Sequence, residues 1–435
     1  MSQAALGILT LAGTLLLLGL RVPIGVALGG VSILGIWYLR GLGVALGALR
    51  SAPYDFMANW ELSAIPMFVL MGAVAHHSGI SRSLFVAARL WLGRLPGGLA
   101  IATNFACAGF AAASGSSVAA AAAMGKIAIP EMLRAGYSPS LATGTVAAAG
   151  TLAALIPPSI LFVLYGIFAQ TSVTKLLIAG VLPGLLTAAV YGIMLYARCL
   201  VFPEIAPPTD VDTTAAERWH ALRDIWPIAL LILGVIGGLL SGIVTPTEAG
   251  AYGAFLAYLI AFLQGRLSWE AFRTSVIEAA TSTSRLLFVA LGAVLLTKYL
   301  ALSGMPFYLA GLMDSWAVDP VFLVAAVSIV YLVLGMFLDP LGIMLITIPI
   351  FVPMFHRLGL DLVWFGVIVV KYLEIGLLTP PVGFNVYVIK TVVGDEIALE
   401  TIFKGVGWFL GCEVVIMTLI IAFPQISLFL PSFID

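Results

Sequence analysis

The chain contains an internal repeat with a spacing of 223 residues. Pro157-Pro158 in the first half is matched by Pro380-Pro381 in the second, since 380 − 157 is 223. Other residues that match at this spacing are Pro130 with Pro353, Arg134 with Arg357, and Gly136 with Gly359. Repeats in a strongly apolar chain are typical of secondary transporters, which place their sites at interrupted hydrophobic segments. Proline lacks a backbone N–H, so the repeat predicts one helix interruption in each half.

The composition indicates a membrane protein. Of the 435 residues, 62% are hydrophobic and 9% are charged, whereas soluble domains carry about 25% charged residues. So few charges cannot cover a soluble fold of this size, and membrane depth admits helices because they satisfy their own backbone hydrogen bonds. We therefore predict an all-α polytopic membrane protein in a lipid bilayer. The net charge of −1 indicates no nucleic-acid partner.

Apolar runs divide the chain into two halves of similar design. We predict a first repeat over residues 1–202, a polar inter-repeat linker over 203–225 and a second repeat over 226–435. Each half offers about five apolar runs that can span a bilayer at about 20 residues per span. An odd number of spans makes the second half enter the bilayer upside down, so we predict inverted-topology repeats.

Each half also contains one apolar stretch that is broken midway. Residues 97–125 are interrupted by Ser114-Gly115-Ser116-Ser117, and residues 320–355 by the segment from Gly335 to Pro340. Such a stretch is typical of a re-entrant hairpin. Non-helical backbone at membrane depth is tolerated only where it lines a cavity or is buried in protein. We therefore expect both hairpin tips to point inward.

The two tips carry candidate cation ligands. The hydroxyls of Ser114, Ser116 and Ser117 are hard oxygen donors, and Gly115 permits a tight turn; carbonyls at half-helix ends coordinate Na⁺ in other transporters. The alternative is that these serines bond back to helix carbonyls. Asp339, which matches Ser116 in the repeat, is an intramembrane carboxylate, and such groups are usually functional. It can ligate a cation, cap the following helix, or do both.

The segments 156–159 and 379–383 are the two proline breaks. Polar or special residues around them are Thr151, Ser159, Thr379, Gly383 and Asn385. Half-helix N-termini there suit a carboxylate or a phosphate. Lys371 lies one turn before the second break; it either pairs with Glu374 at i, i+3 or binds an anionic substrate.

No enzyme signature is present in the sequence. HExxH and GxSxG motifs are absent, and Gly125-Lys126 is followed by Ile127, which does not complete a P-loop. We therefore expect no catalytic residues and no ATP site, and transport would have to run on an ion gradient.

Six motifs resemble one known family. They are Leu62-Ser63-Ala64-Ile65-Pro66-Met67-Phe68; Ser114-Gly115-Ser116-Ser117-Val118-Ala119; Ile129-Pro130-Glu131-Met132 with Gly136-Tyr137; Ile156-Pro157-Pro158-Ser159; Thr245-Pro246-Thr247-Glu248-Ala249; and Glu374-Ile375-Gly376 with Thr379-Pro380-Pro381-Val382-Gly383. In this order they resemble the large membrane subunit of TRAP transporters, the tripartite ATP-independent periplasmic family, over essentially the full length.

The resemblance implies an elevator-type transporter, multi-pass in the bacterial inner membrane and usually driven by Na⁺. It implies a small organic acid as substrate, a periplasmic substrate-binding protein that delivers it, and a small four-helix membrane subunit. Since no such subunit is fused here, we expect it as a separate chain. Proton coupling through Asp339 or Glu374 is the alternative within transport, and an ion channel is the alternative outside it.

The resemblance also implies two Na⁺ sites. The first would use Ser114, Gly115, Ser116 and Ser117 with Thr151 and Pro157. The second would use Gly335 and Asp339 with Thr379 and Gly383. Substrate would lie between the tips, in reach of Ser116, Ser159, Lys371 and Asn385.

Overall fold

The computed structural model describes residues 3–207, 214–305, 308, 311 and 319–434. Within these ranges every regular element is a helix, which confirms the predicted all-α fold class. Residues 208–213 of the predicted linker lie outside the described residues, as do residues 1, 2 and 435 of the predicted repeats.

The helices follow one another along the chain with short connections. The first half contains α1 (Gln3–Gly19), α2 (Ile24–Arg40), α3 (Leu42–Met57), η1 (Trp60–Ser63), α4 (Ala64–His77), α5 (Ile80–Leu92), α6 (Gly98–Ser114), α7 (Ser117–Arg134), α8 (Pro139–Gly150), η2 (Thr151–Ala154), α9 (Ile160–Ala169), α10 (Val173–Ala179) and α11 (Val181–Val201). The described linker contains η3 (Pro203–Ile205) and α12 (Ala215–Asp224). The second half contains α13 (Trp226–Leu240), α14 (Pro246–Leu263), α15 (Trp269–Leu302), α17 (Pro320–Gly335), α18 (Pro340–Arg357), α19 (Leu362–Gly376), α20 (Phe384–Val393), η4 (Gly394–Glu396), α21 (Leu399–Ala422), α22 (Gln425–Leu428) and η5 (Pro431–Phe433).

The spacing of the sequence repeat is kept in the helix boundaries. The helices α7 and α18 begin at residues 117 and 340 and end at 134 and 357, so both ends differ by 223. The pairs α6 and α17, α8 and α19, and α9 and α20 follow the same order around the breaks. The inverted orientation of the two halves in a bilayer stays a prediction.

Fewer helices are long enough to cross a membrane than the apolar runs indicate. Among the described residues, four qualify by length and composition, or up to six if each of two bent pairs is one span. The reason is that breaks divide the runs: residues 138–169 form α8, η2 and α9 around Pro157-Pro158. Conversely, α15 begins at Trp269, well before the apolar run that starts near residue 283.

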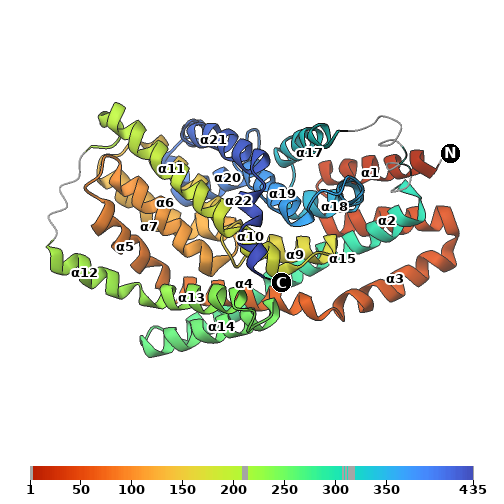
Figure 1. Cartoon of the computed structure of the whole chain (residues 1–435), viewed down its shortest axis with the longest axis horizontal. Coiled ribbons are helices and arrows are strands. Elements are labelled where there is room, and N and C mark those ends of the chain that lie inside the picture. Colours follow the sequence, from red (N-terminus) through yellow and green to blue (C-terminus); the bar gives the residue numbers. More distant parts are fainter. Residues whose placement is uncertain (1–2, 208–213, 306–307, 309–310, 312–318, 435) are drawn as a thin grey trace.

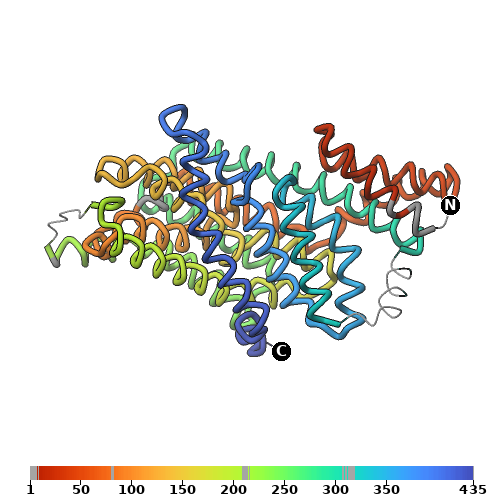
Figure 2. The backbone as a smooth tube through the Cα atoms, turned by 90° about the horizontal axis from the view of Figure 1, so that it is seen from above, coloured from red at the N-terminus to blue at the C-terminus, as the bar shows by residue number. Residues whose placement is uncertain are grey.

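The helices form an elongated body (Figure 1). The first three helices lie at one end of the long axis, and α5 and α12 lie at the other, as Figure 2 also shows. One group is built on α15, which packs against α2 and α4, while α14 also packs on α4. A second group surrounds α8, which contacts α6, α7, α20 and α21. The candidate site lies where α4 and α15 face the broken helices.

Helix breaks inside the apolar interior are closed by local caps. Ser116 caps α7, Ser159 caps α9 and Asp339 caps α18, in each case by accepting a bond from a backbone N–H. The first backbone N–H groups of a helix have no intrahelical partner, and burying them without one is unfavourable. Serine and aspartate at these positions are among the preferred caps, so the polar residues at the breaks have a local structural reason.

Helices α8 and α21 touch through their backbones. A Cβ added at Gly405 of α21 would lie 1.9 Å from the carbonyl oxygen of Ser140, and one added at Gly144 would lie 2.5 Å from the Gly405 carbonyl carbon. The contact therefore requires glycine on both helices.

We predict that Gly405→Ala lowers the midpoint of thermal unfolding, because the new methyl group forces α8 and α21 apart. Overpacking of this kind costs about 1–3 kcal/mol. The matched control is Gly407→Ala on the same helix, since a Cβ there meets nothing within 4 Å. Unfolding of both variants in detergent, followed by tryptophan fluorescence, checks this; equal midpoints for the two would contradict it.

Candidate functional site

The tip of the first hairpin lies against the first proline break. Gly115 has φ +62°, and a Cβ added to it would lie 2.8 Å from the carbonyl oxygen of Pro158. Ser116 Oγ accepts a bond from the Ala119 N–H at 3.4 Å. The oxygens of Ser114 and Ser117 are buried and have no hydrogen-bond partner. These two serines therefore do not bond back to helix carbonyls, which was the alternative to a ligand role.

The tip of the second hairpin is organised by Asp339. Its Oδ2 accepts bonds from the N–H groups of Leu341 at 3.1 Å and Gly342 at 3.4 Å. Asp339 thus caps α18, one of the two roles predicted for it. Gly335 ends α17, and a Cβ added there would lie 2.9 Å from Gly376 Cα of α19. Gly335 permits this helix crossing, which sequence alone did not indicate.

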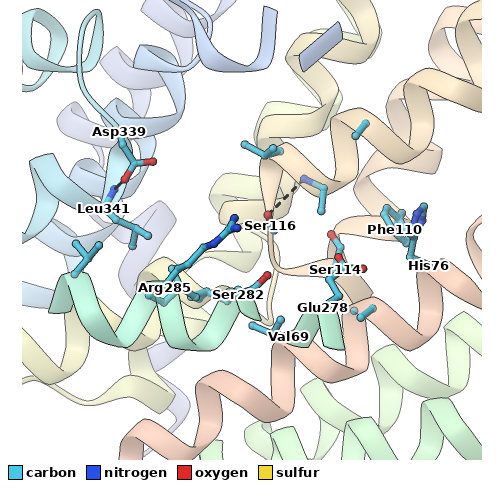
Figure 3. Close-up of a pocket in the computed structure, with 18 residues that line it drawn as sticks. Val69, His76, Phe110, Ser114, Ser116, Glu278, Ser282, Arg285, Asp339 and Leu341 are labelled. Carbon is cyan, nitrogen blue, oxygen red and sulfur yellow. Dashed lines mark hydrogen bonds between the residues drawn. The ribbon is translucent and has the colours of Figure 1, made fainter. Parts of the chain in front are cut away.

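The two tips meet across one cavity of about 580 Å³. Ser114 and Ser116 line it from the first hairpin, and Asp339 lines it from the second (Figure 3). A smaller cavity of about 180 Å³ is lined by Ser116, Ser117, Asp339 and Glu374, among others. Two residues that are far apart in sequence but equivalent in the repeat, Ser116 and Asp339, therefore border both cavities.

Helices α4 and α15 form the opposite wall of the larger cavity. Its polar residues are His76 of α4 and Glu278, Ser282 and Arg285 of α15. Glu278 Oε2 lies 2.7 Å from His77 Nε2, which ties the two helices together. At Gly72 of α4 an added Cβ would lie 2.8 Å from the Ser114 carbonyl oxygen, so this wall packs directly on the first hairpin tip.

Arg285 is the cation of this wall. It is exposed, lines the larger cavity and extends from α15 toward the tip that carries Ser116 (Figure 3). Within the described residues no ion pair or hydrogen bond of its side chain is found. The sequence analysis missed Arg285, although an arginine inside an apolar run is itself a signal for a functional residue. A guanidinium placed in this way suits a carboxylate or another oxyanion.

Three of the four predicted substrate residues lie away from the two cavities. Ser116 lines both. Ser159 Oγ accepts a bond from the Phe162 N–H at 3.3 Å, and Asn385 Nδ2 donates to the Ala147 carbonyl at 3.2 Å. Both of these side chains are fully buried. In this structure they act as a helix cap and as a link between broken helices.

Lys371 pairs with a residue that the sequence analysis did not consider. Its Nζ lies 2.7 Å from Glu413 Oε1 of α21, and both side chains are buried. Tyr191 of α11 donates a hydrogen bond to the same oxygen. The expectation that Lys371 takes Glu374 as its direct partner was therefore wrong. A partner 42 residues away cannot be read from helix periodicity, because the contact depends on how α19 and α21 pack.

The remaining predicted ion ligands are placed in part. Thr151 Oγ1 donates to the Ala148 carbonyl at 2.6 Å, and Thr379 Oγ1 donates to the Ile375 carbonyl at 2.7 Å. Pro157 precedes the carbonyl-bearing Pro158 that touches the first tip. Gly383 has φ +61° and begins α20. The two cavity linings do not contain Thr379 or Gly383, so the second predicted site is only partly assembled around them.

Comparisons with known proteins agree on one family. Residues 11–426 match the model of the "Tripartite ATP-independent periplasmic transporter, DctM component". The chain is 36% identical over 382 residues to the C4-dicarboxylate TRAP transporter large permease protein DctM of Pseudomonas aeruginosa, covering 87% of this chain and 88% of that protein. It is 34% identical over 379 residues to the isethionate TRAP transporter permease protein DctMQ of Oleidesulfovibrio alaskensis, covering 84% and 59%. The fold is similar to that of the Alcanivorax borkumensis YdaH transporter, with a TM-score of 0.56, 17% identity, and coverage of 88% and 89%.

We predict that Gly115→Ala destabilises the protein more than Gly359→Ala does. Both glycines have positive φ, +62° and +65°, but only a Cβ at Gly115 meets backbone, the carbonyl of Pro158. The left-handed conformation costs alanine about 1–2 kcal/mol at both sites, and the steric contact adds to this at Gly115 alone. Thermal unfolding midpoints compare the two variants. A larger loss in Gly359→Ala would show that the tip does not press on the break.

Proposed function

Because the chain belongs to the DctM component family of tripartite ATP-independent periplasmic transporters, we propose that it imports a small organic anion with the Na⁺ gradient. As a family member with apolar helices it is a multi-pass membrane protein, and the bacterial inner membrane is where we expect it.

The observation that carries the proposal is the guanidinium of Arg285 in the cavity between the hairpin tips. It faces hydroxyls of Ser116 and Ser282 across a space of about 580 Å³, which is within the size range of small-molecule sites. An unneutralised arginine beside hydroxyl donors favours a ligand with a negative head group, since charge-assisted hydrogen bonds are the strong ones.

The substrate class that we infer is a small carboxylate, with sulfonates as the nearest variant. The relatives named above are described as C4-dicarboxylate and isethionate transporters, and an anionic head group is what these substrates share. Arg285 is suited to either head group because it offers two parallel N–H donors. Asp339 on the other side of the cavity disfavours a second negative charge placed beside it.

Sodium coupling is supported by the chemistry of the two tips. Asp339 brings an intramembrane carboxylate to the cavity, and Ser114 and Ser117 bring buried oxygens without partners. Hard oxygen donors of this kind suit Na⁺. Proton coupling through a carboxylate is the competing mechanism, and the cation comparison below separates the two.

The transport cycle that we propose is an elevator movement of the hairpins and broken helices past α4 and α15. Two partners complete the system: a periplasmic protein that delivers the substrate, and a small membrane subunit that widens the fixed part. The DctMQ relative is longer than this chain, which spans 59% of it, and this difference supports a separate small subunit here.

We predict that Arg285→Gln weakens binding of organic anions about tenfold or more, because the lost charged hydrogen bonds are worth about 1.5–3 kcal/mol. Thermal stabilisation of the purified chain by succinate, isethionate and the neutral succinamide checks this. The control is Arg273→Gln, also exposed on α15 but outside the cavity. Equal stabilisation by succinamide and succinate, or an unchanged response of Arg285→Gln, would contradict anion recognition here.

We predict that Na⁺ raises the unfolding midpoint relative to K⁺ and choline at equal ionic strength, and that Asp339→Asn reduces this effect. A ligand that binds only the folded state adds about 2.7 kcal/mol at a hundredfold excess over Kd. Asparagine still caps a helix, so the variant removes charge and keeps the cap. Asp361→Asn is the control, because Asp361 caps α19 in the same way outside both cavities. If all three cations act alike in the wild type, Na⁺ coupling is wrong.

A further inference from the structure

We propose that Glu374 supplies the negative charge of a sodium site at the tip of the first hairpin, together with the hydroxyl of Ser117. The inference rests on the proposed sodium coupling. It adds a residue of the second repeat to a site that had been predicted from the first repeat alone.

Two buried oxygens without partners face the same space. The side chains of Glu374 and Ser117 are 2% and 6% exposed, and neither Glu374 Oε2 nor Ser117 Oγ has a hydrogen-bond partner. Both residues line the cavity of about 180 Å³, and the Ser117 hydroxyl lies close enough to interact with the Glu374 carboxyl. Nearly all buried polar atoms are bonded in folded proteins. Two such oxygens around one cavity therefore indicate a ligand that takes lone pairs, which is a cation.

The charges around Glu374 leave one negative charge to be balanced. The charged groups that interact with it are Lys371 and Glu413, and these two form an ion pair of 2.7 Å with each other. One ammonium and two carboxylates sum to a single negative charge in the protein interior. Leaving a buried charge without a partner is strongly unfavourable, so a monovalent cation is the ligand that balances this group.

The available donors select the kind of cation. Carboxylate and hydroxyl oxygens are hard ligands, which suit alkali and alkaline-earth ions rather than soft metals. Among the described residues no cluster of three or more His, Cys, Asp or Glu is present, so the charge offered is small. A sodium ion matches both the donor type and the single charge. A proton would balance the same charge, and the experiment distinguishes the two.

The position of Glu374 in the repeat explains why it reaches this site. It is the counterpart of Thr151, since 374 − 151 is 223, and each lies six residues before the first proline of its break, Pro157 or Pro380. The broken helix of the second repeat thus contributes to the hairpin tip of the first. The site forms only when the two repeats are packed together, beside the cavity that Ser116 and Asp339 share.

The test is a Na⁺ titration of thermal unfolding for the purified chain, with choline holding ionic strength constant. For Glu374→Gln we expect the Na⁺ concentration of half-maximal stabilisation to rise at least tenfold. We also expect a higher midpoint than wild type in choline alone, because the unbalanced buried charge is gone. A merely structural glutamate would not produce this opposite pair of effects.

The matched control is Glu413→Gln, a second buried carboxylate in the same group. It should lower the midpoint in choline, since Lys371 loses its partner, and keep the response to Na⁺. Ser117→Ala provides a second test should Glu374→Gln not be obtained folded; we expect a several-fold weaker Na⁺ response.

The outcomes separate this inference from the proposed function. A wild-type response to Na⁺ that is unchanged in Glu374→Gln, or in Ser117→Ala if that variant alone is obtained, overturns the Glu374 site and leaves sodium coupling standing. No Na⁺ response in the wild type overturns both. A stabilisation that follows pH instead of Na⁺, and that is lost in Glu374→Gln, replaces the sodium ion by a proton.

Discussion

The structure depends on satisfying backbone polar groups wherever a helix stops inside an apolar interior. Unpaired N–H and C=O groups away from water are costly, so each break has to supply its own partners. Ser116, Ser159 and Asp339 do this by capping α7, α9 and α18. The polar residues required by the caps are also the residues that suit ions and anions. Local helix chemistry and the candidate binding chemistry therefore arise from the same few positions.

The cavity has two walls of different character. The hairpin side offers short side chains and helix ends, whereas α4 and α15 offer longer charged groups, chiefly Arg285 and the Glu278–His77 pair. Such an arrangement places one strong cation on one wall and small hard oxygens on the other. An anion and its accompanying cations can then be held in one space without either wall having to bind both.

Breaks and caps were predictable from sequence because they are local. Gly115, Asp339 and the two Pro-Pro pairs each act within a few residues, and the structure keeps their repeat spacing. Lys371 shows what could not be predicted: Glu413 is 42 residues away, and the pair depends on how two helices rotate against each other. Arg285 was missed for a related reason, because α15 extends well beyond the apolar run and the direction of its faces follows from packing on α2 and α4.

The contact between Gly72 and the Ser114 carbonyl has a mechanical consequence. At that point the wall helix and the hairpin tip touch through backbone, with no side chain of Gly72 set between them. Interlocked side chains resist shear because each must be withdrawn before the surfaces shift, and a bare backbone contact lacks that resistance. The seam is thus tight enough to exclude a side chain, yet locally smooth, so one surface can slip along the other at this point without first being pulled away.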